Sequence, residues 1–352
     1  MSINTRPIRI FKLILLLIML SSHGLFSHSV YEKEDEHHEI TIYFTKSAGY
    51  INWENPSKLL KSSIRCYLKA TLRKNYYIIG HTQVRLTSSL IPTPLYAAVT
   101  GAVQSEKVEL VLKKKVGLGA LGSTIQGKME TEEDIKKGIA LYAKRNMVSY
   151  IKFKINAEAV KRILDFMEYY CQKTNADFAP CEKYNGSLWP RYENEGSGCS
   201  AFALTLLDVA NIIPPEANEW LIDVKLPKEL IGGEFNNNKR IKLSTIRKTN
   251  SWYTGIGLKD IDYVNYKVFD PSIINSWICE KRIQNDSIYH AEEEDGLPGL
   301  LVDKRNVMYD TNDTLLRYRT DTTFFVKYYY NEIHGQKEEY KESGGAQMSG
   351  DM

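Results

Sequence analysis

The chain is poor in the residues from which disulfide scaffolds and metal sites are built. It has five cysteines in 352 residues, which are too few and too scattered for a disulfide scaffold. No spacing of cysteine and histidine resembles a zinc site, so we expect neither a metal nor another cofactor. The glycine-rich segment 117–122 lacks the lysine and the strand-to-helix context of a phosphate-binding loop. The cysteines stand at Cys66, Cys171, Cys181, Cys199 and Cys279.

An excess of charge is also lacking. The chain has 46 Lys and Arg against 43 Asp and Glu. The three surplus positive charges, Arg6, Arg9 and Lys12, lie in the first 27 residues, which contain no acid, so the rest of the chain has 43 charges of each sign. A protein without a net positive charge offers nucleic acid no electrostatic attraction, and we expect no nucleic-acid partner.

Long apolar runs are absent except at the start of the chain. Residues 13–20 form an apolar stretch between these basic residues and a small, polar segment that ends at Ser27. The stretch is shorter than a membrane-spanning helix, and the order basic, apolar, small is typical of an export signal. We therefore expect a signal peptide at 1–27, no membrane span in the mature chain, and export to the periplasm, the cell surface or the medium.

What the chain has in quantity is material for a core. Apolar residues make up 43% of it, which is typical of a globular protein. Strand and helix patterns interleave without the strict βαβ alternation of a doubly wound sheet, which favours an α+β fold. The predicted strands are 40–44, 75–86, 108–113, 148–155, 220–224, 263–269 and 321–330, and the predicted helices are 55–72, 131–145, 157–170, 270–279 and one that begins at residue 199.

One cysteine stands in a distinctive context. Cys199 follows Gly196-Ser197-Gly198 and opens the apolar, helix-like stretch 200–210. The first turn of a helix has free backbone N–H groups and the positive end of the helix dipole, which favour a thiolate. Cys199 is therefore the candidate nucleophile. The alternative is that it packs in the core, as free cysteines commonly do.

His81 is the candidate base. A cysteine nucleophile needs an imidazole to take its proton, and His81 alone among the seven histidines lies inside a predicted element, the strand 75–86. The segments 80–86 (GHTQVRL) and 198–203 (GCSAFA) resemble the two halves of a permuted papain-like cysteine hydrolase. That superfamily includes the NlpC-type cell-wall peptidases and the lecithin retinol acyltransferase-like proteins.

The resemblance implies a fold and an activity. The fold is an antiparallel sheet packed on the helix that carries the cysteine, in a domain at 39–285. The activity is hydrolysis of an amide or ester, or acyl transfer, on a peptide, amide or lipid-ester substrate. In that superfamily a third polar residue orients the imidazole, usually from the strand beside the histidine strand. No local motif selects among the candidates in range, which are Thr100, Gln104, Glu106 and Glu109.

Several expectations concern the rest of the chain. Arg191 and Glu195 precede the cysteine and are candidate substrate-binding residues, the alternative being a solvated loop. Cys171 and Cys181 flank a polar loop and are a possible disulfide. The alternative to catalysis is a secreted or envelope interaction protein that retains the fold. The expected flanking segments are a charged leader at 28–38, a C-terminal extension at 286–333 and a disordered tail at 334–352.

Overall fold

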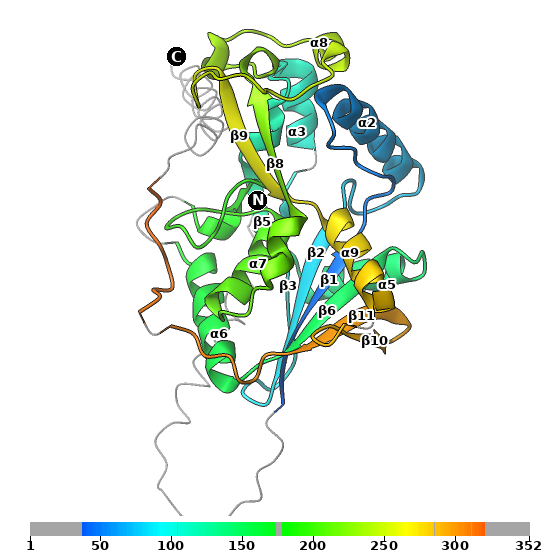
Figure 1. Cartoon of the computed structure of the whole chain (residues 1–352), viewed down its shortest axis with the longest axis vertical. Helices are drawn as coiled ribbons and strands as arrows, with labels where there is room; N and C mark the ends of the chain where they lie inside the picture. The colour runs from blue at the N-terminus through cyan, green and yellow to red at the C-terminus, as the bar shows by residue number, and fades with distance from the viewer. Residues whose placement is uncertain (1–36, 104, 174–177, 285, 311, 321–352) are drawn as a thin grey trace, which may run out of the picture. The chain divides into compact units, whose positions relative to one another are not determined.

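The computed structural model describes residues 37–103, 105–173, 178–284, 286–310 and 312–320. The expected signal peptide, nearly all of the leader, the predicted strand 321–330 and the expected tail lie outside these residues. The described part combines helices with antiparallel and mixed sheets (Figure 1), which confirms the α+β class. In this part of the chain, no helix has the length and apolar character that a membrane crossing requires.

A six-stranded sheet lies at the centre of the fold. In spatial order its strands are β10 (His290–Glu294), β11 (Leu297–Asp303), β6 (Val148–Lys154), β1 (His38–Thr45), β2 (His81–Ser88) and β3 (Leu95–Ala97). β1 pairs antiparallel with β2 and β6, and β11 lies parallel to β6. The register of β1 and β2 sets Thr45 opposite His81, so the candidate base lies at the first position of its strand.

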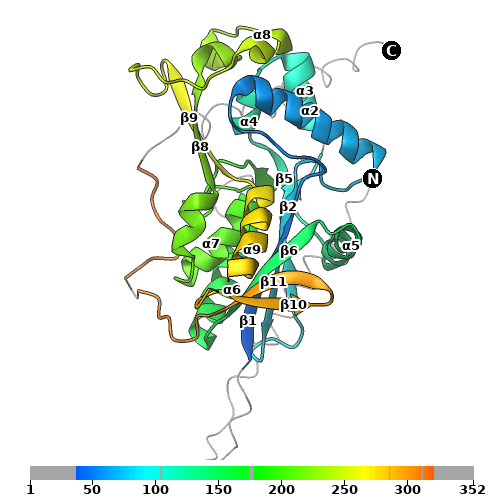
Figure 2. The same ribbon diagram turned by 45° about the vertical axis from the view of Figure 1, so that its right-hand side comes forward.

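Helices cover both faces of this sheet. They are α5 (Glu132–Ala143), α6 (Ala157–Cys171), α7 (Cys199–Val209) and α9 (Pro271–Gln284), whereas α2 (Pro56–Leu72) packs on the helix Leu243–Lys248. Successive side chains of a strand point to opposite faces. Ile42 and Phe44 of β1 pack with α6, α7 and α9 in the largest apolar cluster, whereas Tyr43 packs with Tyr142 of α5. Figure 2 shows α7 and α9 on one side of the sheet and α5 on the other.

A second apolar cluster lies among the remaining elements. Leu110, Ile125, Leu230 and Val264 belong to it. The strands here and near the site are β4 (Val99–Gly101), β5 (Ile125–Met129) and β7 (Lys183–Tyr184), and the two-stranded ribbon of β8 (Leu221–Pro227) and β9 (Tyr263–Phe269). The short helices are α3 (Ser105–Glu109), α4 (Gly119–Gly122) and α8 (Leu243–Lys248). Helical turns lie at Leu110–Lys114, Pro180–Glu182, Pro215–Trp220, Lys228–Leu230 and Glu234–Asn236.

Two expectations about local structure are corrected. The strand predicted at 108–113 is helical, because α3 continues into the π-helical turn Leu110–Lys114 and buries Leu110 alone of its apolar residues. The helix predicted at 55–72 is present as α2, but of the apolar residues that repeat along it at helical spacing, Leu59 is buried and later ones are not. Ile64 is 46% and Leu68 is 56% exposed, while the helix buries small residues such as Cys66 and Ala70.

The segment expected as a C-terminal extension is part of the central sheet. β10 and β11 both follow residue 285, and β11 pairs with β6. A domain that ended at 285 would leave that edge of β6 unpaired. The described residues after β11, 304–310 and 312–320, are called the C-terminal strap below.

Candidate functional site

Backbone contacts of two glycines fix the start of α7. A side chain at Gly196 would place its Cβ 1.9 Å from the carbonyl oxygen of Lys183, and one at Gly198 would place it 2.8 Å from the Cα of Gly186. The loop therefore lies directly on β7, where the Ser197 N–H donates to the Lys183 carbonyl at 3.1 Å. Gly198 is the N-cap of α7, and Cys199 is its first residue, as predicted from the sequence.

His81 is held at the start of β2, next to this helix. Gly80 precedes it with a φ of +88°, a conformation that favours glycine, and a Cβ there would meet the Thr45 carbonyl oxygen at 2.8 Å. α7 packs on β2, and the Ser200 and Thr82 hydroxyls are 2.8 Å apart. The His81 ring stacks on the Tyr77 ring with centroids 3.8 Å apart. These contacts place the imidazole at the mouth of the helix that Cys199 opens.

Glu130 is the hydrogen-bond partner of His81 Nε2. Its Oε2 lies 2.9 Å from His81 Nε2, and the two side chains are only 8% and 2% exposed. The Tyr77 hydroxyl donates to the same carboxylate at 3.2 Å, and Gln83 Nε2 donates to that hydroxyl at 3.1 Å. A buried carboxylate held in this way fixes the orientation and tautomer of the imidazole.

The Cys199 thiol and the His81 imidazole lie close enough that each acts directly on the pKa of the other. Since Nε2 is bonded to Glu130, Nδ1 is the nitrogen available to the sulfur. Burial by itself would lower the pKa of His81, but the charges of Cys199 and Glu130 outweigh it and raise this pKa to about 9. Burial also acts to raise the pKa of Cys199, yet the His81 imidazolium holds that pKa below its ordinary value. The imidazolium thus shifts the Cys199 thiol toward its thiolate form.

Two further donors act on the sulfur. The Thr82 backbone N–H and the Tyr184 hydroxyl both stabilise its anionic form and lower its pKa. The Cys199 N–H in turn acts to lower the pKa of the Tyr184 hydroxyl, which lies near the first turn of α7. Burial and the neighbouring thiolate raise the pKa of Tyr184 well above its ordinary value. Tyr184 therefore keeps its proton and acts as a donor.

None of the four residues proposed from the sequence to orient the imidazole is the partner found at Nε2. Glu106 accepts a hydrogen bond from the Gln126 N–H at 3.1 Å, and Glu109 pairs with Lys113 on the surface. Thr100 lies in β4, and Gln104 is outside the described residues. The correct carboxylate is Glu130, the residue after β5. β5 runs beside β4, with Met129 opposite Val99, and this pairing carries Glu130 to the histidine.

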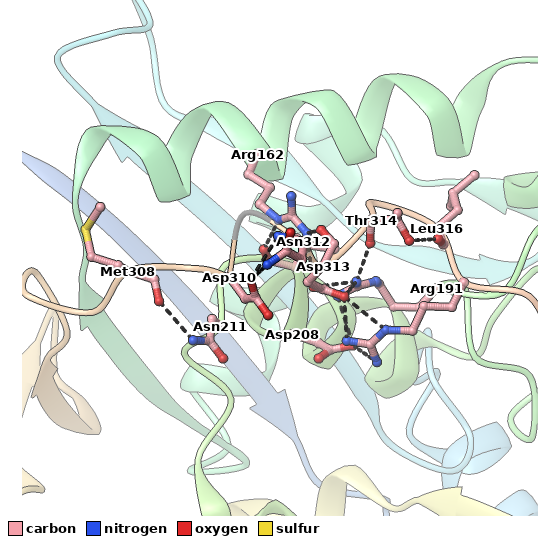
Figure 3. Close-up of polar contacts among 12 residues, drawn as sticks. Arg162, Arg191, Asp208, Asn211, Met308, Asp310, Asn312, Asp313, Thr314 and Leu316 are labelled. Atoms are coloured by element: carbon pink, nitrogen blue, oxygen red, sulfur yellow. Dashed lines mark hydrogen bonds and ion pairs between the residues drawn. The ribbon is translucent and has the colours of Figure 1, made fainter.

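The assignment of Arg191 and Glu195 to substrate binding is wrong. Arg191 is 0% exposed, and its guanidinium pairs with Asp208 of α7 at 3.2 Å and with Asp313 of the C-terminal strap at 2.8 Å (Figure 3). Glu195 accepts from the Trp189 N–H at 3.2 Å and from Arg319 of the strap at 2.7 Å. Both side chains are used to fasten the loop before Cys199, so neither is available to a ligand.

This ion-pair cluster predicts a loss of stability. Arg191→Ala should lower the free energy of unfolding by about 3–5 kcal/mol, because it removes one member of a buried charge network. Arg305→Ala is the matched control, since it breaks an exposed pair with Asp303 and should cost less than about 1 kcal/mol. Urea denaturation measures both. Equal, small effects of the two changes would contradict the anchoring role of Arg191.

The cysteines outside the site are free thiols. Cys171 and Cys181 are not joined by a disulfide in the structure, although the two thiols are close enough to act on each other's pKa. This contact lowers the pKa of Cys171 and, together with burial, raises that of Cys181. Cys66 and Cys279 are also unpaired. The described residues contain no group of three or more His, Cys, Asp or Glu side chains arranged to hold a metal ion.

Sequence reasoning missed Glu130, Tyr184 and Lys107, a lysine of α3 on whose ammonium group the charge of Cys199 acts. Glu130 stands directly before Thr131, the N-cap of α5. The sequence signal at this point is a helix-capping pattern, which involves Thr131 and the residues after it but not Glu130. No strand was predicted at 125–129 or 183–184, so nothing in the sequence pointed to Glu130 or Tyr184.

Comparisons of this chain with family models, with curated proteins and with solved structures give no match, and its function is therefore argued from the geometry of the site.

Proposed function

We propose that this chain is a cysteine-dependent hydrolase or acyltransferase that acts on amides or esters. The observation that carries the proposal is a buried series in which the Cys199 thiol adjoins the His81 ring and His81 Nε2 is hydrogen-bonded to Glu130. A nucleophile in contact with a base, and a base oriented by a third group, is the arrangement that nucleophilic catalysis uses. Cys199 is the nucleophile, His81 the base and acid, and Glu130 the positioning residue.

The first half of the reaction forms a thioester. The Cys199 thiolate attacks the carbonyl carbon, a C–S bond forms, and the π electrons of the carbonyl move to its oxygen. When this intermediate collapses, the bond to the leaving amine or alcohol breaks, and His81 gives its proton to the departing atom. Because the pKa of His81 is about 9, the imidazole holds this proton throughout the neutral range.

The second half releases the acyl group. Neutral His81 takes a proton from water or from another molecule that accepts the acyl group. The oxygen or nitrogen that loses this proton attacks the thioester carbon. The C–S bond breaks and returns Cys199 to a thiolate beside the imidazolium. In both halves the N–H of Cys199, at the first turn of α7, and the hydroxyl of Tyr184, which acts on the same cysteine, are the candidate donors to the developing oxyanion.

The arrangement of the elements supports a permuted papain-like core as the fold behind this site. The strand with the histidine, β2, precedes the cysteine helix α7 in the chain, and α7 packs on β2. By resemblance, the substrates to test are cell-wall peptides and lipid amides or esters. The export expected from the first 27 residues suits substrates outside the cytoplasm.

Selective alkylation tests the nucleophile. A limiting amount of iodoacetamide at neutral pH should label Cys199 before the other four cysteines, because its thiolate is stabilised. Mapping by mass spectrometry should show that Cys199→Ala abolishes this fast labelling while the protein remains folded. Cys171→Ala is the control, since Cys171 is exposed and its pKa is also lowered, and it should leave the labelling of Cys199 unchanged. Fast labelling that persists in Cys199→Ala would favour the non-catalytic interaction protein.

A further inference from the structure

Lys107 is a cation on whose pKa the charge of Cys199 acts. The same charge acts on the pKa of His81, but His81 is paired with Glu130. Lys107 is thus a second positive charge at the sulfur, and the reaction as described above does not use it.

Two contacts place Lys107 at the site, one made by its helix and one made by its own ammonium group. It belongs to α3, which is attached to β5 through the hydrogen bond from the Gln126 N–H to the Glu106 carboxylate. Its Nζ lies 6.0 Å from the centre of the Tyr184 ring, and the hydroxyl of that ring acts to lower the pKa of Cys199. The ammonium group therefore lies over the face of the tyrosine that contacts the nucleophile.

Lys107 has no carboxylate partner among the described residues. Lys113, in the π-helical turn that follows α3, pairs with Glu109, and Lys136 and Lys137 of α5 pair with Glu132 and Glu133. Burial lowers the pKa of Lys107 to about 8, while the negative charge of Cys199 acts in the opposite direction. The side chain is still largely protonated at neutral pH, and the thiolate is the anion that balances it.

Acylation removes that anion. Once the thioester forms, the sulfur is neutral, and a partly buried ammonium group without an anionic partner is unfavourable. The developing oxyanion compensates it only transiently. A group that replaces the thiolate for the lifetime of the thioester has to belong to the acyl part of the substrate, because the leaving group has departed.

We propose that Lys107 binds an anionic group, a carboxylate, on the acyl part of the substrate close to the carbonyl that Cys199 attacks. The inference rests on the proposed function and narrows its substrate class to acidic acyl groups. Lys107 is then a specificity-determining residue, which favours anionic over neutral substrates of the same size.

Two alkylating reagents of nearly equal size test this inference. Iodoacetate and iodoacetamide react alike: the thiolate displaces iodide, a C–S bond forms, and the reagents differ in carrying a carboxylate or an amide. In Lys107→Gln the rate constant for labelling Cys199 should fall about tenfold more for iodoacetate than for iodoacetamide, because a nearby cation attracts the anionic reagent alone. The ratio cancels any change in the thiolate fraction. Lys107→Arg should keep the wild-type ratio, as should the surface control Lys113→Gln.

The outcomes separate this inference from the proposed function. Fast labelling of Cys199 with the same ratio in wild type and Lys107→Gln overturns the role of Lys107 and leaves the nucleophile in place. Absence of fast labelling by either reagent contradicts the proposed function itself. A measurement on the wild type avoids any dependence on folding of the variant: glutarate should slow the iodoacetamide reaction of Cys199 in a saturable way, and neutral glutaramide should not. Equal effects of the two compounds, or no effect of glutarate, would also overturn the inference.

Discussion

His81→Asn should abolish most of the reactivity of Cys199. Without the imidazolium, burial is left to raise the pKa of the thiol, so its pKa should return at least to the ordinary value of about 8.5. At pH 7 the thiolate fraction would then be a few per cent, and the iodoacetamide rate constant should fall about thirtyfold or more. Turnover of an acyl substrate should fall further, by about a thousandfold, because the leaving group also loses its proton donor.

A second histidine serves as the control for this change. His290→Asn alters an exposed residue of β10, at the far end of the sheet order from β2 and β3. It should leave both rates unchanged. Circular dichroism of the two variants verifies that each remains folded. A folded His81→Asn protein that reacts with iodoacetamide at the wild-type rate would show that the imidazole does not stabilise the thiolate.

Glu130→Gln should lower turnover by about a hundredfold, a smaller loss than that of His81 because the base remains. The amide is similar in size to the carboxylate but carries no charge, so the pKa of His81 should fall, since the Glu130 carboxylate contributes to raising it. The alkaline limit of the pH profile should therefore move below pH 9. A structural role alone would not produce this displacement, and the pH profile of turnover measures it.

Glu133→Gln is the matched control for Glu130→Gln. Glu133 lies three residues further on, in the first turn of α5, where it forms an exposed pair with Lys137. Its replacement should change neither turnover nor its pH profile. If Glu130→Gln and Glu133→Gln behave alike, Glu130 does not position the imidazole.

The elements that carry Cys199 and His81 were predictable because their signals are local. Gly198 and Cys199 are followed by an unbroken apolar stretch, and α7 begins at Cys199 as predicted. The β-branched and polar alternation of 81–86 likewise predicted β2, although the strand begins at His81 rather than at residue 75. In each case the information lies within a few residues of the functional side chain.

The rest of the site depends on pairings that are distant in sequence. Glu130 reaches His81 because β4 and β5 pair, and Tyr184 reaches Cys199 because β5 and β7 pair. No propensity or spacing encodes these pairings in strands of two to five residues. Arg191 was misread for a similar reason, since its partner Asp313 lies more than a hundred residues away and makes a structural network resemble a binding loop.

The most direct test of the account is the pH dependence of the rate at which iodoacetamide labels Cys199 in the wild-type protein. The account predicts a thiolate that is already formed at neutral pH, so the rate should be near its plateau at pH 7 and fall only in more acidic solution. A rate that is low at pH 7 and rises through about pH 8.5, as for a free cysteine, would contradict it.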